Sequence, residues 1–144
     1  MTDINFYVSK QDGLLSRLNI AYRLIGLARQ RGLSIHIHTD NEQTSQKIDE
    51  LLWKKESQSF IPHIIVNNED TGDTYQNEIT ISCDFEPMQH CDYLINLSNQ
   101  RPAFFSRFKK VAEILDSTED IISAGRKRYA FYKERGYTLG YHKL

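Results

Sequence analysis

Basic residues are missing from a long central part of this 144-residue sequence. Residues 56–100 contain eight acidic side chains and no Lys or Arg, whereas residues 101–144 contain ten basic and five acidic side chains. The net formal charge is only −1. A protein that binds DNA through its phosphates usually carries a strong basic excess. The charge therefore does not indicate a dedicated DNA-binding protein, although the basic end could attract an acidic peptide or a short nucleic-acid segment.

Cysteines and long apolar runs are also scarce. Two cysteines, Cys83 and Cys91, are too few for a scaffold built on disulfides. No apolar run approaches the roughly 18 residues that a membrane span needs, and the first residues lack the basic and apolar regions of a signal peptide. We therefore expect a cytoplasmic protein with reduced thiols and no membrane association. A length of 144 residues suits one domain, spanning residues 1–144.

The sequence lacks the motifs of the common cofactor and metal sites. Its seven glycines form neither a G-x-G-x-x-G turn nor a Walker loop. Cys83, His90 and Cys91 have a spacing that fits a zinc site poorly, and His36 and His38 have no third ligand nearby in the sequence. No Cys or Ser is paired with a His and an orienting third group. We therefore predict no cofactor, no metal and no catalytic residues.

Predicted strands and helices alternate along the chain. Apolar or alternating runs predict strands in residues 4–8, 33–39, 63–67, 78–82, 93–97 and 111–115, the final run being the last strand expected. Apolar residues at helical spacing predict helices in residues 14–31, 101–108 and 117–135, and a helix from a capping box at Thr39 or Asp40 to about Trp53. This order predicts an α/β domain with a largely parallel sheet.

The stretch from the end of the second helix to the third strand holds the only Trp of the chain. Trp53 follows an apolar pair, six polar residues come next, and Phe60 then precedes Pro62. Because Pro cannot continue a helix and loops lie at the surface, one or both large rings could face solvent and form an interaction surface. The alternative is that both rings pack under the loop as part of the core.

The C-terminal helix brings a cation beside aromatic side chains. Arg126 and Tyr129 lie three residues apart on one face, and Tyr132 follows about one turn later. A guanidinium can bind a carboxylate with two parallel hydrogen bonds, and Tyr rings supply apolar walls. This pattern suits a peptide that ends in an aromatic residue with a free carboxylate. The alternative is a solvated helix face with its Tyr rings packed on the sheet.

Several segments together resemble one protein family. They are Asn5-Phe6-Tyr7 and residues 48–53, 59–63, 93–97, 126–132 and 136–137. In this order they resemble the chi subunit of bacterial DNA polymerase III holoenzyme, and the resemblance covers nearly the whole chain. It implies a Rossmann-like three-layer fold with a C-terminal helix, no catalytic activity, and two partners. The partners are the psi subunit, which links chi to the clamp loader, and the acidic C-terminal tail of single-stranded-DNA-binding protein, which ends in Pro-Phe.

The resemblance also assigns residues to these two interactions. The residues that match the psi-facing surface are Trp53, Phe60 and Pro62. Those expected at the tail-binding pocket are Leu115, Arg126 and Tyr129, with Arg128 and Tyr132 on the same helix. The sequence departs from its relatives at Ile122, where a lysine can occur in the family.

The family comparison implies a replication accessory subunit that reaches DNA mainly through its protein partners. Two other functions fit the sequence less well. One is a nucleotide-dependent enzyme on a Rossmann-like sheet, against which the missing phosphate-binding loop counts. The other is a direct binder of single-stranded DNA that uses the basic tail.

Overall fold

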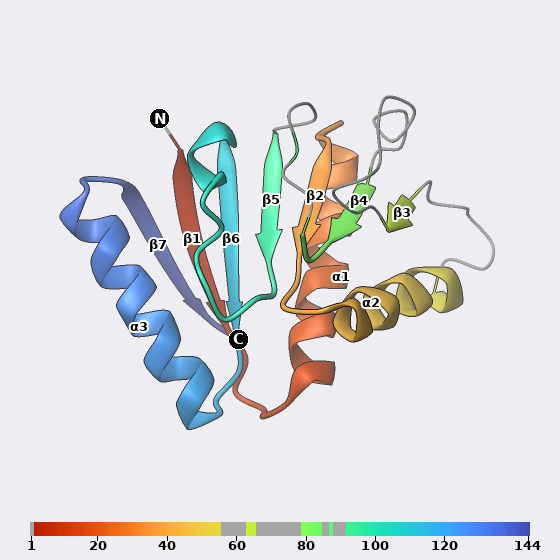
Figure 1. Ribbon diagram of the computed structural model, residues 1–144, viewed down its shortest axis with the longest axis horizontal. Coiled ribbons are helices and arrows are strands. Elements are labelled where there is room, and N and C mark those ends of the chain that lie inside the picture. The colour runs from red at the N-terminus through yellow and green to blue at the C-terminus, as the bar shows by residue number, and fades with distance from the viewer. Residues whose placement is uncertain (1, 56–62, 66–78, 85–86, 88–91) are drawn as a thin grey trace.

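The protein forms a seven-stranded parallel sheet with helices on both faces (Figure 1). The computed structural model describes residues 2–55, 63–65, 79–84, 87 and 92–144. The strand order is β3-β4-β2-β5-β6-β1-β7, and every recorded strand pair is parallel. The strands are β1 (Asp3–Val8), β2 (Ile35–His38), β3 (His63–Ile65), β4 (Ile79–Ser82), β5 (Tyr93–Asn96), β6 (Lys110–Leu115) and β7 (Thr138–Lys143). The helices are α1 (Leu14–Gln30), α2 (Glu42–Lys55) and α3 (Glu119–Glu134), with a 3₁₀ turn, η2 (Phe105–Arg107).

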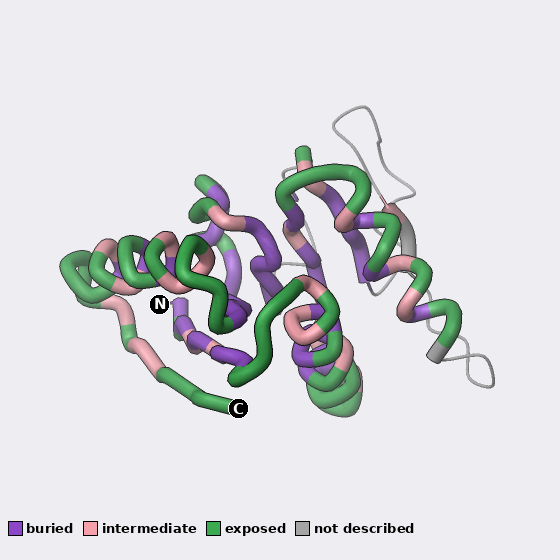
Figure 2. The backbone as a smooth tube through the Cα atoms, turned by 90° about the horizontal axis from the view of Figure 1, so that it is seen from below, coloured by how far each residue is buried: buried purple, intermediate pink, exposed green. Residues whose placement is uncertain are grey.

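Two apolar clusters divide the core between the faces of the sheet. One face packs against α1 and α2 and contributes Ile35, Ile37, Ile79, Ile81 and Ile95. The other face packs against α3 and η2 and contributes Ile4, Phe6, Val8, Leu94 and Val111. Figure 2 shows α1 and α3 on opposite sides of the sheet. The predicted three-layer α/β fold with a C-terminal helix is therefore confirmed. Separately, no described helix is long and apolar enough to span a membrane.

The helix ends follow local sequence signals, with one exception. Gly32 and Gly136 follow α1 and α3 with positive φ angles, as C-terminal glycines do. The predicted capping box before α2 is wrong. Asn41 caps the helix, because its side-chain oxygen accepts a hydrogen bond from the backbone N–H of Thr44 at 2.9 Å. The hydroxyl of Thr39 instead donates to the carbonyl of Asn41 at 3.0 Å and lies 2.7 Å from that of Ser45.

The prediction that residues 111–115 form the last strand is also wrong. The chain continues after α3 into β7, which pairs with β1 in parallel from Asp3 opposite Thr138 to Val8 opposite Lys143. Without β7, the free edge of β1 would expose a row of unpaired N–H and C=O groups. The tail residues alternate in the strand manner, and this signal was missed because its aromatic and basic composition suggested a surface tail.

The predicted helix in residues 101–108 is reduced to the three-residue turn η2. In a 3₁₀ turn, side chains three residues apart lie on the same side, so Phe105 and Phe108 both enter the core together with Phe104. The hydroxyl of Thr2 donates to the carbonyl of Phe108 at 2.6 Å. This bond gives the Phe108 carbonyl a buried partner.

Gly125 allows α3 to approach β6 closely. A Cβ atom at this position would fall inside contact distance of Leu115 Cδ1 and would lie 2.9 Å from Leu115 Cδ2. Gly26, in α1, is the matched comparison, because a Cβ atom there would have no neighbour within 4 Å. The packing of α3 on Leu115 therefore favours glycine at position 125.

We predict opposite effects for alanine at the two helical glycines. Gly26→Ala should be neutral or should raise the free energy of unfolding by up to about 1 kcal/mol, the helix-propensity difference. Gly125→Ala should be less stable than Gly26→Ala by about 1–3 kcal/mol, because Leu115 must move. Urea unfolding of both variants measures the difference. Equal stabilities would mean that α3 and β6 are not in close contact.

Candidate functional site

A groove lies between α3 and the carboxyl ends of β1, β6 and β7. We call it the α3 groove, and its volume is about 980 Å³. Its apolar lining comprises Phe6, Val8, Leu115, Ile122, Tyr129 and Tyr141, and its charged lining comprises Lys10, Glu119, Arg126 and Lys143. The groove forms because β7 continues the sheet beneath α3, so that the last residues of β7 face the first half of the helix.

The apolar part of the groove is held by core packing. The rings of Phe6 and Tyr129 lie 5.3 Å apart, centroid to centroid, at an interplanar angle of 60°. Phe6 and Leu115 are buried, whereas Tyr129 is partly exposed. A ligand ring placed here would meet preformed apolar and aromatic surface, so little side-chain ordering would oppose its binding.

Three cations and one carboxylate surround this apolar surface. Arg126 is exposed on α3, Lys143 is exposed at the end of β7, and Lys10 follows β1. The position of Lys10 is fixed by its backbone, whose N–H donates to the carbonyl of Leu144 at 3.1 Å and whose carbonyl accepts from the Ser117 hydroxyl at 3.2 Å. With Glu119 as the acidic member, the lining keeps a positive excess that favours an anionic ligand.

The structure brings together part of the predicted tail-binding set. Leu115, Arg126 and Tyr129 all line the α3 groove, and so does Ile122. Sequence reasoning missed Lys10 and Lys143, as well as Phe6 and Tyr141. Tyr141 and Lys143 are two positions apart on β7, so their side chains point to the same face of the sheet. A correct prediction of that strand would have placed both on the α3 side.

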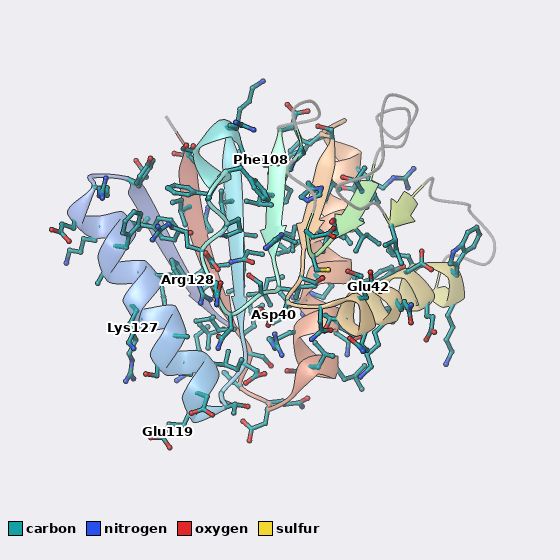
Figure 3. All side chains as sticks on the ribbon, in the orientation of Figure 1. Asp40, Glu42, Phe108, Glu119, Lys127 and Arg128 are labelled. Atoms are coloured by element: carbon teal, nitrogen blue, oxygen red, sulfur yellow. The ribbon has the colours of Figure 1, made fainter. Side chains whose placement is uncertain are left out.

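Arg128 and Tyr132 are not in this groove, and their expected position was wrong. Both are buried, and both bind the buried carboxylate of Glu113 on β6. Arg128 Nε donates to Glu113 Oε1 at 3.0 Å, and the Tyr132 hydroxyl donates to Oε2 at 2.7 Å. In Figure 3, Arg128 points from α3 toward the sheet, whereas Lys127 points away from it. A helix has about 3.6 residues per turn, so Arg128 is turned away from the face that Arg126 occupies.

The carboxylate of Glu113 also joins α3 to the end of β5. Asn96 Nδ2 donates to Glu113 Oε1 at 2.8 Å and to the carbonyl of Gln100 at 3.0 Å. Burial raises the pKa of Glu113, and the Arg128 charge and the hydrogen bonds from Tyr132 and Asn96 oppose that rise. Burial also raises the pKa of Tyr132, so its hydroxyl stays a donor. The network is structural, since every member lies in the core.

The predicted psi-facing residues are only partly within the described chain. Trp53 lies on α2 with 51% of its surface exposed, which agrees with an interaction surface better than with a core position. Phe60 and Pro62 lie outside the described residues.

Of the two histidines of β2, His36 is a core residue and His38 is half-buried. His36 is fully buried, its Nδ1 lies 2.6 Å from the Thr80 hydroxyl, and burial lowers its pKa to about 3, so the ring is neutral. Its ring packs against Phe104 and Phe108. The His side of β2 is therefore a covered face of the sheet. Among the described residues, no group of three His, Cys, Asp or Glu side chains could hold a metal ion.

An ion pair stands where α/β proteins commonly bind nucleotides, beyond the carboxyl ends of the central strands. Arg17 of α1 donates from Nε to Asp116 Oδ2 at 2.9 Å and from Nη1 to the carbonyl of Leu97 at 3.1 Å. Burial raises the pKa of Asp116, but its bonds to Thr118 and Arg17 outweigh this and lower it. The pair fastens α1 to the ends of β5 and β6.

Comparison with known proteins assigns the chain to a class of replication proteins. A family model described as "DNA polymerase III chi subunit, HolC" matches residues 1–140. The chain therefore belongs to the chi family of DNA polymerase III accessory subunits.

Individual relatives carry the same description. The chain is 33% identical over 144 residues to the DNA polymerase III subunit chi of Pseudomonas aeruginosa, covering 100% of this chain and 98% of the relative. It is 27% identical over 135 residues to the Haemophilus influenzae subunit, covering 93% and 92% of the two chains. It is 24% identical to the Escherichia coli subunit, covering 96% of each chain.

We predict that Arg128→Met lowers the free energy of unfolding by about 3–5 kcal/mol at pH 7, because it leaves the Glu113 carboxylate buried without its counter-charge. The matched control is Lys127→Met, which removes a neighbouring exposed cation and should change stability by no more than about 0.5 kcal/mol. Thermal and urea unfolding measure both variants. Equal losses would show that the buried pair contributes nothing.

The loss caused by Arg128→Met should also depend on pH. The folded-state pKa of Glu113 is raised, so ionisation of this group weakens the fold as pH rises above the unfolded-state pKa. Removing Arg128 raises the folded-state pKa further, so the stability deficit should be larger at pH 7 than at pH 5. A deficit that does not change with pH would assign the effect to packing alone.

Proposed function

We propose that this protein is a non-catalytic connector in DNA replication. In this proposal it binds the psi subunit through the exposed part of Trp53 on α2, which we call the Trp53 surface. It binds the acidic C-terminal tail of single-stranded-DNA-binding protein through the α3 groove. The two contacts would link the clamp loader to coated single-stranded DNA. Membership of the chi family and the chemistry of the groove support this function.

The observation that carries the proposal is the combination of apolar floor and basic rim in the α3 groove. The terminal ring of the tail would lie against Leu115, Tyr129 and Phe6. Its carboxylate would bind Arg126, whose two parallel donors match a carboxylate. The acidic residues that precede the ring would be attracted by Lys10 and Lys143, two cations on the other wall.

The Trp53 surface supports the second contact. A half-exposed Trp on α2 offers a large apolar ring at low conformational cost, and such rings are enriched among the residues that dominate binding energy. Trp53 lies on α2, and the α3 groove lies at the opposite end of the sheet (Figure 1). Both partners could therefore bind at the same time.

A nucleotide-dependent enzyme remains the competing function. The side chain of Arg17, paired with Asp116, stands beyond the strand ends where such a ligand would be expected. Calorimetric titration with nucleotides distinguishes the two functions, since the connector should give no binding heat.

We predict that Arg126→Ala weakens binding of an acidic peptide ending in Pro-Phe by at least about tenfold, the loss expected for charge-assisted hydrogen bonds. Lys127→Ala is the matched control, because Lys127 is an exposed neighbouring cation that does not line the groove. Amidating the peptide should weaken wild-type binding but should have little further effect on Arg126→Ala. Isothermal titration measures all four combinations. If amidation weakens Arg126→Ala as much as wild type, the carboxylate binds elsewhere and Lys10 or Lys143 becomes the candidate.

For the second surface, we predict that Phe60→Ala and Trp53→Ala each weaken psi binding by about 2 kcal/mol or more. The melting temperature should change little, because a surface ring contributes little to folding. Leu15→Ala is the control, since Leu15 is an exposed apolar residue on α1. Affinity and melting temperature are measured together. A large loss of stability with unchanged affinity would place these rings in the core.

A further inference from the structure

On one face of the sheet, the edge strand β7 has no described helix over it, and α1 lies beside the neighbouring strand β1 at Tyr7. On β1, the residues Asp3, Asn5 and Tyr7 point away from α3, because their neighbours Ile4, Phe6 and Val8 fill the core on that side. On β7, the register places Thr138, Gly140 and His142 beside them. We call these six residues the β1–β7 face. Figure 2 shows α3 over one side of β7 and no helix over the other.

The β1–β7 face carries a fixed pair of stacked rings. Tyr7 and His142 lie 4.8 Å apart, centroid to centroid, with an interplanar angle of 16°. His142 Nε2 lies 3.1 Å from Asn5 Oδ1, so a hydrogen bond sets the ring orientation. Gly140 makes this arrangement possible, because a Cβ atom there would clash with Asn5 Oδ1 and lie 3.4 Å from His142 Nε2. His142 is exposed, so its outer ring surface is accessible.

A hollow of about 200 Å³ lies between these rings and the end of α1. Its lining includes the polar groups of Asn5, Tyr7 and Tyr93 and two cations, Arg31 and Lys110, and it includes no carboxylate. The carboxylate of the β1–β7 face, Asp3, is not part of this lining. Aromatic rings therefore adjoin a hollow with two positive charges and several hydrogen-bonding groups.

We propose that the β1–β7 face and its adjoining hollow bind single-stranded DNA. Proteins that bind single strands combine cations that contact the phosphates with exposed rings on which bases stack. Here a base would stack on His142, and the neighbouring phosphates would contact Arg31 and Lys110. The accessible outer face of the His142 ring suits a planar base, whereas an acidic peptide would need pockets for its side chains. The proposal does not depend on the tail-binding function of the α3 groove.

This surface lies on the opposite side of β1 and β7 from the α3 groove. Alternate residues of the same two strands build the two sites: Tyr141 and Lys143 line the groove, whereas His142 belongs to the stacked pair. A replication subunit with both sites would contact the DNA strand directly and a protein partner at the same time.

The test is fluorescence anisotropy of a labelled oligo(dT) of about 15 nucleotides, within the range of known site sizes, titrated with the full chain at low and moderate salt. His142→Ala should weaken binding about fivefold or more, the loss of one stacked base. The double variant Arg31→Ala/Lys110→Ala should lower the slope of log affinity against log salt by about 1.4, the value for two phosphate contacts with a single strand. The matched control is Lys127→Ala/Lys133→Ala, which removes two exposed cations of α3 that line neither site.

Several results would overturn the proposal. The first is that the wild type does not bind oligo(dT) at low salt. The second is that the control double variant loses as much affinity as the test double variant. The third is that Arg126→Ala loses as much affinity as His142→Ala, which would place the strand in the α3 groove. An acidic peptide that displaces the oligonucleotide and depends on His142 equally would make the surface a general anion site. Amide chemical shifts of the wild type give a second measurement that needs no variant. Oligo(dT) should shift Asn5, Gly140 and His142, and shifts confined to other residues would refute the site.

Discussion

The buried carboxylate of Glu113 is the interaction on which the arrangement of α3 depends. It accepts hydrogen bonds from Arg128 and Tyr132 of the helix and from Asn96 of β5, so three elements meet at one side chain. Apolar packing alone would allow α3 to slide or rotate over the sheet, since it is non-directional. Two directional bonds, four residues apart on the helix, restrict that freedom. We infer that the network contributes as much to the position of the helix as to the stability of the fold.

The position of α3 in turn determines the shape of the groove. Gly125 lets the helix approach Leu115 closely, and Tyr129 packs against Phe6 one turn later. At the other end, the last residues of β7 lie across from the helix start and supply Tyr141 and Lys143. The groove is therefore built from residues far apart in the sequence, most of which belong to α3 and the strands β1, β6 and β7. Such a site is formed before a ligand arrives, which reduces the entropic cost of binding.

The layers of this fold were predicted from the sequence more accurately than the edge strand β7 and the residues of the α3 groove. Ile35 and Ile37 alternate with the two His residues of β2, and the structure confirms that this period separates the two faces. The tail strand was missed although its residues alternate, because its aromatic and basic composition suggested a surface tail and its partner β1 lies at the other end of the sequence. Arg128 and Tyr132 were expected near the tail-binding pocket because they share a helix with Arg126 and Tyr129. The buried Glu113, 15 residues before Arg128 and 19 before Tyr132, explains their position.

The central place of β1 in its part of the sheet has a consequence for synthesis on the ribosome. This strand is made first, but its two neighbours, β6 and β7, are contributed by residues 110–115 and 138–143. During translation, both edges of β1 thus lack their native partners until most of the chain has emerged. An apolar strand with free edges is prone to pair with other chains. The nascent N-terminal segment is therefore a natural client for chaperones, and a fusion that delays release of the C-terminal end would prolong its exposure.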